Sequence, residues 1–319
     1  MSKMSTDPTR RALNGPTMGT RWSALFFAED VDETAFTAAL QIVVDQIDDQ
    51  MSTWNPDSDL MRFNAAPTGT WVALPAHLLN VMTLGLGIGR ASGGAFDITM
   101  GASLKAWGFG SEAPQEAEIR AAMEGTKVPA LDALEIDLAQ GRARKHADVA
   151  VDLNGIAKGY GVDRLAETLA DMGISDALVG IDGEMRSLGT HPDGTPWTIA
   201  VEAPNYDRRA PHSVLALEDG AVATSGDYRH WVEVQGRRLS HTMHPKLRTP
   251  IANGPASVTV VAPTCAEADA WATAIIVLGI RAGLVLAGGQ GLDVLALERA
   301  DGAGILSHGI GPLFGLEPA

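Results

Sequence analysis

The sequence predicts an α+β fold in which helices and hairpins alternate irregularly along the chain. Three observations lead to this prediction. Apolar residues recur with helical spacing in several separate stretches, strand-like runs come in adjacent pairs, and no internal repeat or linker orders them. A regular alternation of strands and helices would instead indicate a doubly wound parallel sheet.

The first helix is expected over residues 32–51, where apolar side chains recur every three or four positions. The acidic residues Asp45, Asp48 and Asp49 lie on its other face. Thr264-Cys265-Ala266-Glu267 has the form of a capping box, which predicts the start of a helix. The other helices are expected over residues 76–91, 115–124, 155–172, 264–278 and 281–287.

Strands are expected where short apolar or β-branched runs lie between turn residues. The runs 134–138 and 149–153 flank a turn near Gly141, and Gln235-Gly236 joins another pair as a hairpin. The remaining strands are expected over residues 177–181, 197–202, 231–234, 238–241, 257–261, 292–298 and 304–308.

Composition limits the partners and the chemistry. The chain has 319 residues, and 39 acidic against 24 basic residues give a net charge of −15. This charge disfavours nucleic acid as the main partner, because it repels the phosphate backbone. The one cysteine, Cys265, excludes an internal disulfide and a site with several thiolates. It is interpreted as a small structural residue near a helix start.

The sequence also carries expectations about location. No apolar run reaches the roughly 18 residues that a membrane-spanning helix needs, so no transmembrane segment is expected. Residues 1–20 are polar and have no apolar signal core. A cytoplasmic location is the expectation from the sequence as written, and a periplasmic one is the alternative if a leader was removed.

Asp269 and Thr273 lie four residues apart on the helix that starts after Thr264, so their side chains project from one face. That face is otherwise apolar. A carboxylate and a hydroxyl that converge there suit Mg²⁺, which prefers oxygen ligands. The alternative is an exposed aspartate and a threonine whose hydroxyl is satisfied by its own helix.

The segment Asp152–Tyr160 runs from a predicted strand end through a glycine turn into a helix. Unpaired N–H groups at such a turn bind anions, and Lys158 lies one turn into the helix. The lysine can meet a phosphate or pair with an acidic side chain. The alternative for the whole segment is a tight strand–helix connection that is capped by Asp152 and binds no ligand.

Phe96 and Asp97 follow a pair of glycines. A flat heterocycle can stack on the ring while the carboxylate accepts a hydrogen bond from its edge. A helix C-cap followed by a strand explains the same residues without a ligand. Trp54, in Met51-Ser-Thr-Trp54, is likewise either part of a helix end or an aromatic lid.

Two histidines, His241 and His244, lie at the end of a predicted strand. His241 is a candidate general base, because an imidazole exchanges its proton near neutral pH. The alternative is a structural role, which is the more common one for a single histidine. The spacing alone leaves both interpretations open.

Taken in order along the chain, several motifs resemble those of the ApbE family, the FAD:protein FMN transferases. The resemblance covers most of the sequence and rests on the ordered set, because any one motif alone is unspecific. The motifs are Pro16–Thr20, Met51–Trp54, Phe63-Asn64, Gly93–Asp97, Val151–Tyr160, Thr224–Tyr228, Ala268–Thr273 and Val277–Gly279.

The resemblance implies a T-fold-like α+β fold, with a mixed and antiparallel sheet, flanking helices and an FAD cleft between two lobes. It also implies an enzyme that transfers the FMN moiety of FAD. The implied acceptor is a threonine or serine hydroxyl of a flavoprotein in a redox system, the implied metal is Mg²⁺, and AMP is the leaving group.

The resemblance assigns roles to residues of this chain. Magnesium ligands fall on the side chains of Asp269 and Thr273 and on the main-chain carbonyl of Gly155, and His241 matches the histidine proposed as catalytic in relatives. The implied site residues extend over nearly the whole chain, from Met18 to Thr273. One domain over residues 1–319 is therefore expected, with residues 1–14 as a flexible N-terminal segment. FAD contacts fall on Met18, Trp54, Ala95, Phe96, Asp97, Asp152, Lys158 and Met243.

The sequence departs from the family after His241. The family continues His-x-x-Asp-Pro-x-Thr-Gly-x-Pro, whereas His244 stands here for the aspartate and Leu247-Arg248 for the Thr-Gly pair. A milder change is Asp182-Gly183, where the family has two glycines before its acidic residue. Two alternative functions remain: an FAD-binding or carrier protein with weakened chemistry, and an FAD pyrophosphatase that forms FMN and AMP.

Overall fold

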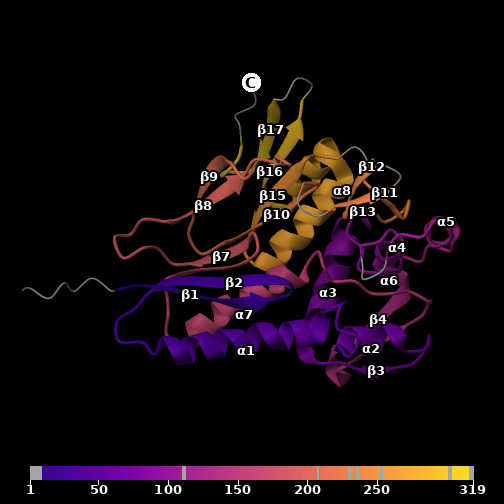
Figure 1. Cartoon of the computed structure of the whole chain (residues 1–319), viewed down its shortest axis with the longest axis horizontal. Helices are drawn as coiled ribbons and strands as arrows, with labels where there is room; N and C mark the ends of the chain where they lie inside the picture. Colours follow the sequence, from indigo (N-terminus) through magenta and orange to yellow (C-terminus); the bar gives the residue numbers. More distant parts are fainter. Residues whose placement is uncertain are drawn as a thin grey trace, which may run out of the picture.

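A large antiparallel sheet runs through the centre of the fold. The computed structural model describes residues 9–109, 113–206, 208–228, 231–234, 237–251, 254–300 and 304–315. Within these residues the sheet has eight strands, and its mixture with flanking helices confirms the predicted α+β class (Figure 1). In spatial order the strands are β1 (Arg10–Thr17), β2 (Thr20–Phe27), β6 (Ala177–Ile181), β7 (Glu184–Leu188), β10 (Ala221–Gly226), β15 (Ser257–Ala262), β16 (Asp293–Arg299) and β17 (Ile305–Ile310).

Helices cover one face of this sheet. The helices α1 (Glu33–Met51) and α7 (Ala157–Asp171) pack together beside β1, β2 and β6, and α8 (Cys265–Gln290) runs along β10 and β15 (Figure 1). Trp22, Leu40 and Leu165 are fully buried between α1, α7 and the sheet. The first turns of α7 and α8 are thereby fixed against the centre of the sheet.

A hairpin covers the other face of the sheet. It consists of β8 (Trp197–Glu202) and β9 (Pro211–Leu217), which pair antiparallel. Trp197 belongs to a buried apolar cluster that also contains Leu178 of β6 and Leu297 of β16. The sheet is therefore buried on both faces, and accordingly every residue of β15 is buried.

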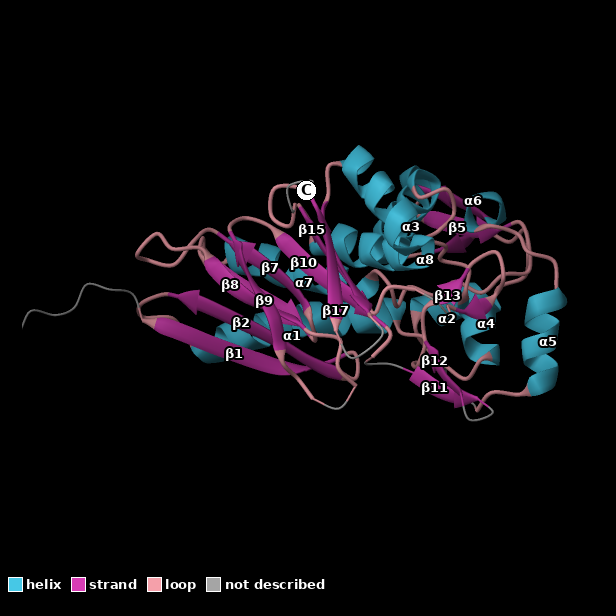
Figure 2. Ribbon diagram, turned by 90° about the horizontal axis from the view of Figure 1, so that it is seen from above, coloured by secondary structure: helices cyan, strands magenta, loops and turns pink. Residues whose placement is uncertain are grey.

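A second group of elements lies beyond α8, at the end of the molecule away from β1 (Figure 2). Its α3 packs on α8, and a small sheet in the order β3-β5-β4 completes it. The elements are α2 (Asp59–Ala65), β3 (Val72–Ala73), α3 (Ala76–Ala91), α4 (Gly101–Ala106), α5 (Glu116–Glu124), α6 (Ala130–Ala133), β4 (Leu134–Asp137), the 3₁₀-helix η1 (Leu138–Gln140) and β5 (Arg142–Lys145).

Two short hairpins lie at the edge of this second group. The first pairs β11 (Trp231–Val234) with β12 (Arg237–Ser240), and the second pairs β13 (Met243–His244) with β14 (Thr249–Pro250). The predicted pair of strands around Gln235-Gly236 is confirmed, while the turn itself lies outside the described residues.

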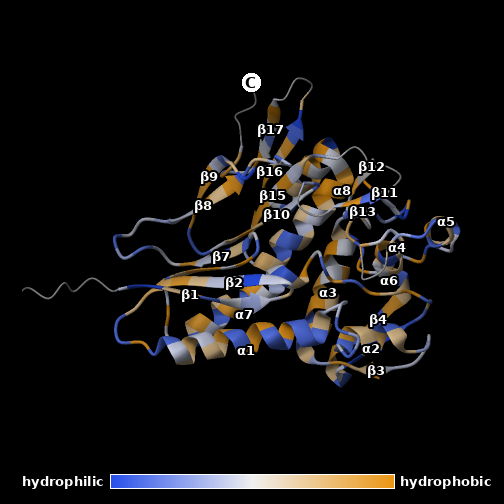
Figure 3. Ribbon diagram, viewed as in Figure 1, coloured by the Kyte–Doolittle hydropathy of each residue, from blue (hydrophilic) through white to orange (hydrophobic). Residues whose placement is uncertain are grey.

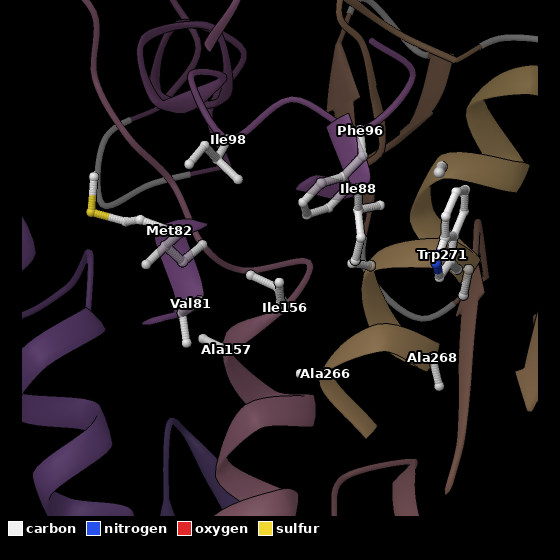
Figure 4. Packing of buried hydrophobic residues seen from close by; sticks show 14 of the residues in the cluster. Val81, Met82, Ile88, Phe96, Ile98, Ile156, Ala157, Ala266, Ala268 and Trp271 are labelled. Carbon is white, nitrogen blue, oxygen red and sulfur yellow. The ribbon is translucent and has the colours of Figure 1, made fainter. Parts of the chain in front are cut away.

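The largest apolar cluster joins the two groups of elements. It contains Phe96 and Ile98 from the segment after α3, Ile156 from the turn before α7, and Ala266 and Trp271 from α8 (Figure 4). All five are nearly or fully buried. The segments that carry Phe96, Gly155 and Asp269 are thus anchored in one shared core.

Capping and amphipathicity explain why the predicted helices form. The Asp32 carboxylate accepts hydrogen bonds from the N–H groups of Thr34 and Ala35 at the start of α1. The helix then carries both polar and apolar residues (Figure 3), and Phe36, Leu40 and Val44 are buried in the cluster that it shares with the sheet. Thr264 caps α8 through the Glu267 N–H, as the capping box predicted.

Two sequence-based expectations about elements were wrong, and one hairpin was not predicted. Residues 149–153 form no strand; β5 at 142–145 pairs with β4 instead, directly after the turn at Gly141. Residues 10–14, expected in a flexible segment, belong to β1 and pair with β2, while residues 1–8 lie outside the described part. The β1–β2 hairpin was missed because β1 is too polar to show a strand pattern.

The helix α8 combines two predicted helices. Gly279 breaks its helical geometry with φ 75° and ψ 170°, at the boundary between the predicted segments 264–278 and 281–287. Among the described residues, α8 is long and apolar enough to cross a membrane by length and composition, but 44% of its apolar stretch is buried inside the fold. Because a core helix of a soluble protein meets the same test, this is weak evidence for a membrane span.

Candidate active site

Asp269 and Thr273 lie on the part of α8 that faces the centre of the fold. Asp269 is 5% exposed, and its Oδ2 accepts a hydrogen bond of 3.2 Å from the N–H of Gly159 in α7. The Thr273 hydroxyl is 3.2 Å from the hydroxyl of Ser225 in β10. The alternative interpretation, an exposed aspartate beside a threonine whose hydroxyl is satisfied by its own helix, is therefore wrong.

The glycine turn before α7 meets Thr273 directly. A Cβ added to Gly155 would lie 3.1 Å from Thr273 Oγ1 and 3.3 Å from Cε2 of Phe96. A larger residue at position 155 would crowd both neighbours, so the glycine permits this close approach. The structure thus brings together three segments that are far apart in the sequence.

The donors at this point suit a hard cation. Asp269 contributes a buried carboxylate and Thr273 a hydroxyl, and the Gly155 backbone lies against that hydroxyl. Within the described residues, no group of three or more His, Cys, Asp and Glu side chains is placed to hold a metal. A magnesium ion here would therefore need the hydroxyl and a backbone carbonyl besides one carboxylate, and these all-oxygen donors fit the ion.

Electrostatics at Asp269 favour a nearby cation. Burial, and next to it the carboxylate of Glu184, raise the pKa of Asp269 well above its usual range, while Lys158 opposes this shift. A buried carboxylate gains free energy from any positive charge placed beside it. The surroundings of Asp269 therefore favour the binding of a cation.

Lys158 is held between two acidic side chains of the β6–β7 turn. Its Nζ donates to Glu184 Oε1 at 2.8 Å and lies 3.4 Å from Asp182 Oδ2. Burial disfavours the charged lysine, but Glu184 and Asp269 outweigh it and raise the pKa of Lys158. Of the two predicted possibilities the structure shows the acid pairing, and these acidic neighbours favour the charged form of the lysine.

Asp152 is joined to the Phe96–Asp97 segment through the backbone. The Asp152 N–H donates to the carbonyl of Ile98 at 2.8 Å, and its carboxylate accepts from the N–H and side-chain amide of Asn154. Burial raises the pKa of Asp152 to about 6. Asp152 therefore caps the turn, and it also lies beside the segment predicted to bind the heterocycle.

The Phe96–Asp97 segment is held by burial and by hydrogen bonds. Ala95 and Phe96 are buried, and Asp97 Oδ1 accepts from the N–H and hydroxyl of Thr99 at 2.7 and 2.5 Å. Asp97 Oδ2 lies 3.3 Å from the N–H of Ala130 at the start of α6. A hollow of about 20 Å³ opens beside Phe96 and Asp97, so a ring-sized ligand would lie over its rim rather than inside it.

Met18 lies at the turn between β1 and β2. Met18 and Gly19 have φ 47° and 71°, the left-handed geometry of a two-residue hairpin. The Cε of Met18 is 3.3 Å from where a Cβ on Gly161 of α7 would be, so this side chain reaches toward the helix of Lys158. Trp54 lies in the turn between α1 and α2, and the residue is 65% exposed.

His241 follows β12 and is partly exposed, two residues before the buried Met243. The loop after it keeps a compact turn despite the departure from the family. His244 Nδ1 accepts from the N–H groups of Lys246 and Leu247 at 3.2 and 3.4 Å, and the Arg248 N–H donates to the His244 carbonyl at 2.8 Å. The imidazole thus does what an aspartate side chain does in such a turn.

Several supporting residues were not assigned by the sequence. Glu184 holds Lys158, and Ser225 meets Thr273, although both lie in stretches that had been compared with the family. Asn64 forms paired hydrogen bonds of 2.7 and 2.8 Å with the backbone of Val151, which holds the segment before Asp152. Only the quoted Phe63-Asn64 motif pointed to it in advance.

A buried aspartate links the two helices of the site. Asp163 of α7 accepts hydrogen bonds from the N–H groups of Cys265 and Ala266 at 2.8 and 2.9 Å, and it pairs with Arg186 at 2.7 Å. It therefore stabilises the first turn of α8 and fixes Asp269 relative to Lys158. No sequence signal singled it out, because a lone aspartate within a helix is usually exposed.

Comparison with known proteins places this arrangement in a family. The ApbE family profile matches residues 18–296. An FAD:protein FMN transferase of Vibrio cholerae is 35% identical over 296 residues, which cover 91% of this chain and 87% of the relative. One from Escherichia coli is 34% identical over 293 residues, which cover 90% and 84%.

Solved structures agree with the sequence comparisons. The flavin transferase ApbE from Vibrio cholerae has a TM-score of 0.83 at 32% identity and covers 96% of this chain and 98% of its own. The apo form of the Pseudomonas stutzeri flavinyl transferase ApbE has a TM-score of 0.84 at 34% identity and covers 100% of both chains. This chain belongs to the ApbE family.

Proposed function

We propose that the chain transfers the FMN moiety of FAD to a threonine or serine hydroxyl of an acceptor flavoprotein, with Mg²⁺ bound and AMP released. The hydroxyl oxygen forms a bond to the FMN phosphorus, and the bond from that phosphorus to the oxygen of the AMP phosphate breaks. The hydroxyl proton goes to a base. The names of the relatives, FAD:protein FMN transferase and flavinyl transferase, support flavin transfer.

One observation carries the proposal: Thr273 and the Gly155 backbone meet beside Phe96, one helical turn from the buried Asp269 on α8. The same place joins a candidate cation site to a candidate surface for a flat ring. A nucleotide that contains a flavin and a pyrophosphate needs a surface for the ring and a cation for the phosphates, and the two must lie close enough for one molecule to contact both.

A bound Mg²⁺ would neutralise the pyrophosphate and act there as a Lewis acid. The chain's own residues hold the substrate. Lys158 supplies a fixed positive charge in the first turn of α7, directly after the glycine turn. Because Lys158 is held by Glu184 and Asp182, its charge is positioned before a substrate arrives, which is mainly a gain in orientation.

His241 is the proposed base. It is partly exposed, whereas Asp269 is buried, so the hydroxyl of a second protein can approach the histidine from solvent. Removal of the hydroxyl proton as the new bond to phosphorus forms contributes about 10²–10⁴ in rate in enzymes. The acidic net charge does not oppose binding of FAD, because Lys158 and the cation act locally.

The direct test is an incubation of the protein with FAD, Mg²⁺ and a flavin-acceptor domain, followed by detection of flavin fluorescence on the acceptor in a denaturing gel. Fluorescence on the acceptor, lost when its target hydroxyl is replaced by alanine, is the expected result. Chelation of the divalent cation with EDTA should abolish the labelling, and added Mg²⁺ should restore it.

The same assay separates the alternatives. Free FMN and AMP without labelled acceptor would indicate a pyrophosphatase that uses water. Retained FAD with neither product would indicate a carrier. The compact turn at His244 and Arg248 does not favour weakened chemistry, because its backbone hydrogen bonds are made.

A further inference from the structure

Arg248 is an unusual residue for its position. It is 8% exposed, and its φ of 59° lies in the left-handed region, where a long side chain costs conformational free energy. A glycine would adopt this conformation freely. The protein therefore keeps a strained, buried arginine where a simpler residue would form the same turn.

The contacts of Arg248 explain why it is retained. Its Nη1 donates to the carbonyl of Thr99 at 2.9 Å and lies 3.3 Å from the sulfur of Met100. Its own carbonyl accepts from the indole N–H of Trp107, at the end of α4, at 2.9 Å. Arg248 thus links the turn that follows His241 to a segment about 150 residues earlier in the chain.

That earlier segment is the wall of the candidate site. Thr99 donates through both its N–H and its hydroxyl to Asp97, and Ile98 accepts from the N–H of Asp152. One side of the segment is therefore fixed to the glycine turn before α7. Arg248 fixes the other side to the loop that carries His241 and Met243.

We propose that Arg248 is a positioning residue: its guanidinium holds the 241–250 turn against residues 96–100, and so sets the place of His241 relative to the flavin surface. The effect on turnover rests on the proposed function. The tether itself is a property of the fold and does not depend on that function.

The chemistry of the guanidinium suits this role. Among the described residues, no carboxylate lies within ion-pair distance of Arg248, so a carbonyl and a sulfur receive its hydrogen bonds. The planar group presents several donors in a fixed fork, whereas a lysine ammonium is a compact charge on a flexible stem. Lysine at this position should therefore restore the tether only in part.

Three variants test the proposal. Arg248→Gly removes the tether and also relieves the left-handed strain, so the turn is expected to fold. Arg248→Lys keeps the positive charge. Arg120→Ala changes an exposed arginine of α5 and serves as the matched control.

Hydrogen exchange gives a readout that needs no flavin. In Arg248→Gly, amides of residues 96–104 and of 241–250 should both exchange about tenfold faster than in the wild type. Arg248→Lys should lie between the two, and Arg120→Ala should match the wild type. Faster exchange in 241–250 with residues 96–104 unchanged would overturn the proposal, because the turn would then be mobile without any effect on the wall.

Flavin measurements complete the test. Arg248→Gly should raise the Kd for FAD and lower kcat for transfer, each about tenfold, and guanidinium ion at millimolar concentration should recover part of the loss. No recovery by guanidinium and none by lysine would overturn the positioning role. A wild-type protein that fails to transfer flavin would instead overturn the proposed function, while the exchange data would still decide about the tether.

Discussion

One half of the candidate site, called the buried half after its buried carboxylate Asp269, is built on the turn before α7, the first turn of α7 and the second and third turns of α8. It consists of Asp152, Gly155, Lys158, Asp269 and Thr273. The turn half, residues 241–250, is built on short hairpins at the edge of the second group of elements. Core packing fixes the first half through residues such as Ile156 and Ala266, whereas a few polar contacts from Arg248 fix the second.

This difference separates two tasks. Holding a charged nucleotide requires fixed charges and donors, which a rigid core provides. Receiving a hydroxyl from another protein requires access from solvent, which a partly exposed turn provides. The departures from the histidine motif, His244 and Arg248, fall in the turn half, whereas the milder change at Asp182 lies beside Lys158.

The largest effect is expected in the buried half. Asp269→Ala should reduce Mg²⁺-dependent transfer by about 10³-fold or more, because the one carboxylate of the cation site is lost. Transfer rates measured against Mg²⁺ concentration check this. Asp49→Ala, at an exposed position of α1, should leave transfer unchanged. Mg²⁺-dependent transfer that is retained in Asp269→Ala would contradict the assignment of Asp269 as a metal ligand.

His241→Ala should lower kcat by about 10²–10⁴ while the Kd for FAD changes little, because it removes a proton acceptor but no part of the buried half. Stopped-time transfer assays and flavin fluorescence titration measure the two quantities. The control is His308→Ala, which changes a histidine paired with Glu298 on the far strands. A large rise in Kd with kcat unchanged would show that His241 binds FAD rather than acting on the hydroxyl.

Lys158→Met should weaken FAD binding by about 10- to 100-fold, as expected when one charge-assisted contact to phosphate is lost. Lys158→Arg should recover part of the affinity. Titration of the same variants with FMN provides a second measurement of the loss in affinity. An equal loss for FAD and for riboflavin, which has no phosphate, would contradict a phosphate contact.

Asp152→Asn should change stability in a pH-dependent way. The pKa of about 6 in the folded protein lies above the usual 3.8, so the folded state favours the protonated acid, and this contribution is lost as pH rises toward and above 6. At pH 7.5 the asparagine variant should therefore be more stable than the wild type by about 1–3 kcal/mol, with little difference at pH 4.

Urea unfolding at the two pH values measures this effect. Asp171→Asn, at an exposed position at the end of α7, is the matched control and should show no such difference. An Asp152→Asn variant that is less stable at pH 7.5 than at pH 4, relative to the wild type, would mean that its hydrogen bonds outweigh burial.

The smallest effect is expected for His244→Asp, which restores the family residue in the turn half. His244 already accepts the two N–H groups that an aspartate would accept, so kcat should change by less than about threefold, since the hydrogen bonds are conserved in number. A rise of more than tenfold would show that the missing negative charge matters to His241 and would revive the weakened-chemistry alternative.

Much of the local structure follows from the sequence. The helices over 33–51 and 76–91 were predictable because their apolar spacing and start signals act within one or two turns. The strand 177–181 and the break at Gly279 were predictable for the same reason. The β1–β2 hairpin was not, because β1 is stabilised by pairing with β2 rather than by an apolar pattern of its own.

The candidate site shows the same limit. The spacing of Asp269 and Thr273 predicts one shared helix face, and the structure confirms that this face is turned inward. The partners of the site residues were not predictable. Glu184, Ser225 and Asp163 have no local pattern, because each acts on a residue that is distant in the sequence.

By itself, the sequence determined the α+β class, most helices, the acidic charge and the residue types of a possible oxygen-rich cation site. Its ordered motifs determined the family. Only the tertiary structure decided that Gly155 meets Thr273 and Phe96, that Lys158 pairs with Glu184, and that Arg248 reaches Thr99. Periodicity and capping depend on neighbours along the chain, whereas these contacts form only when the core brings distant segments together.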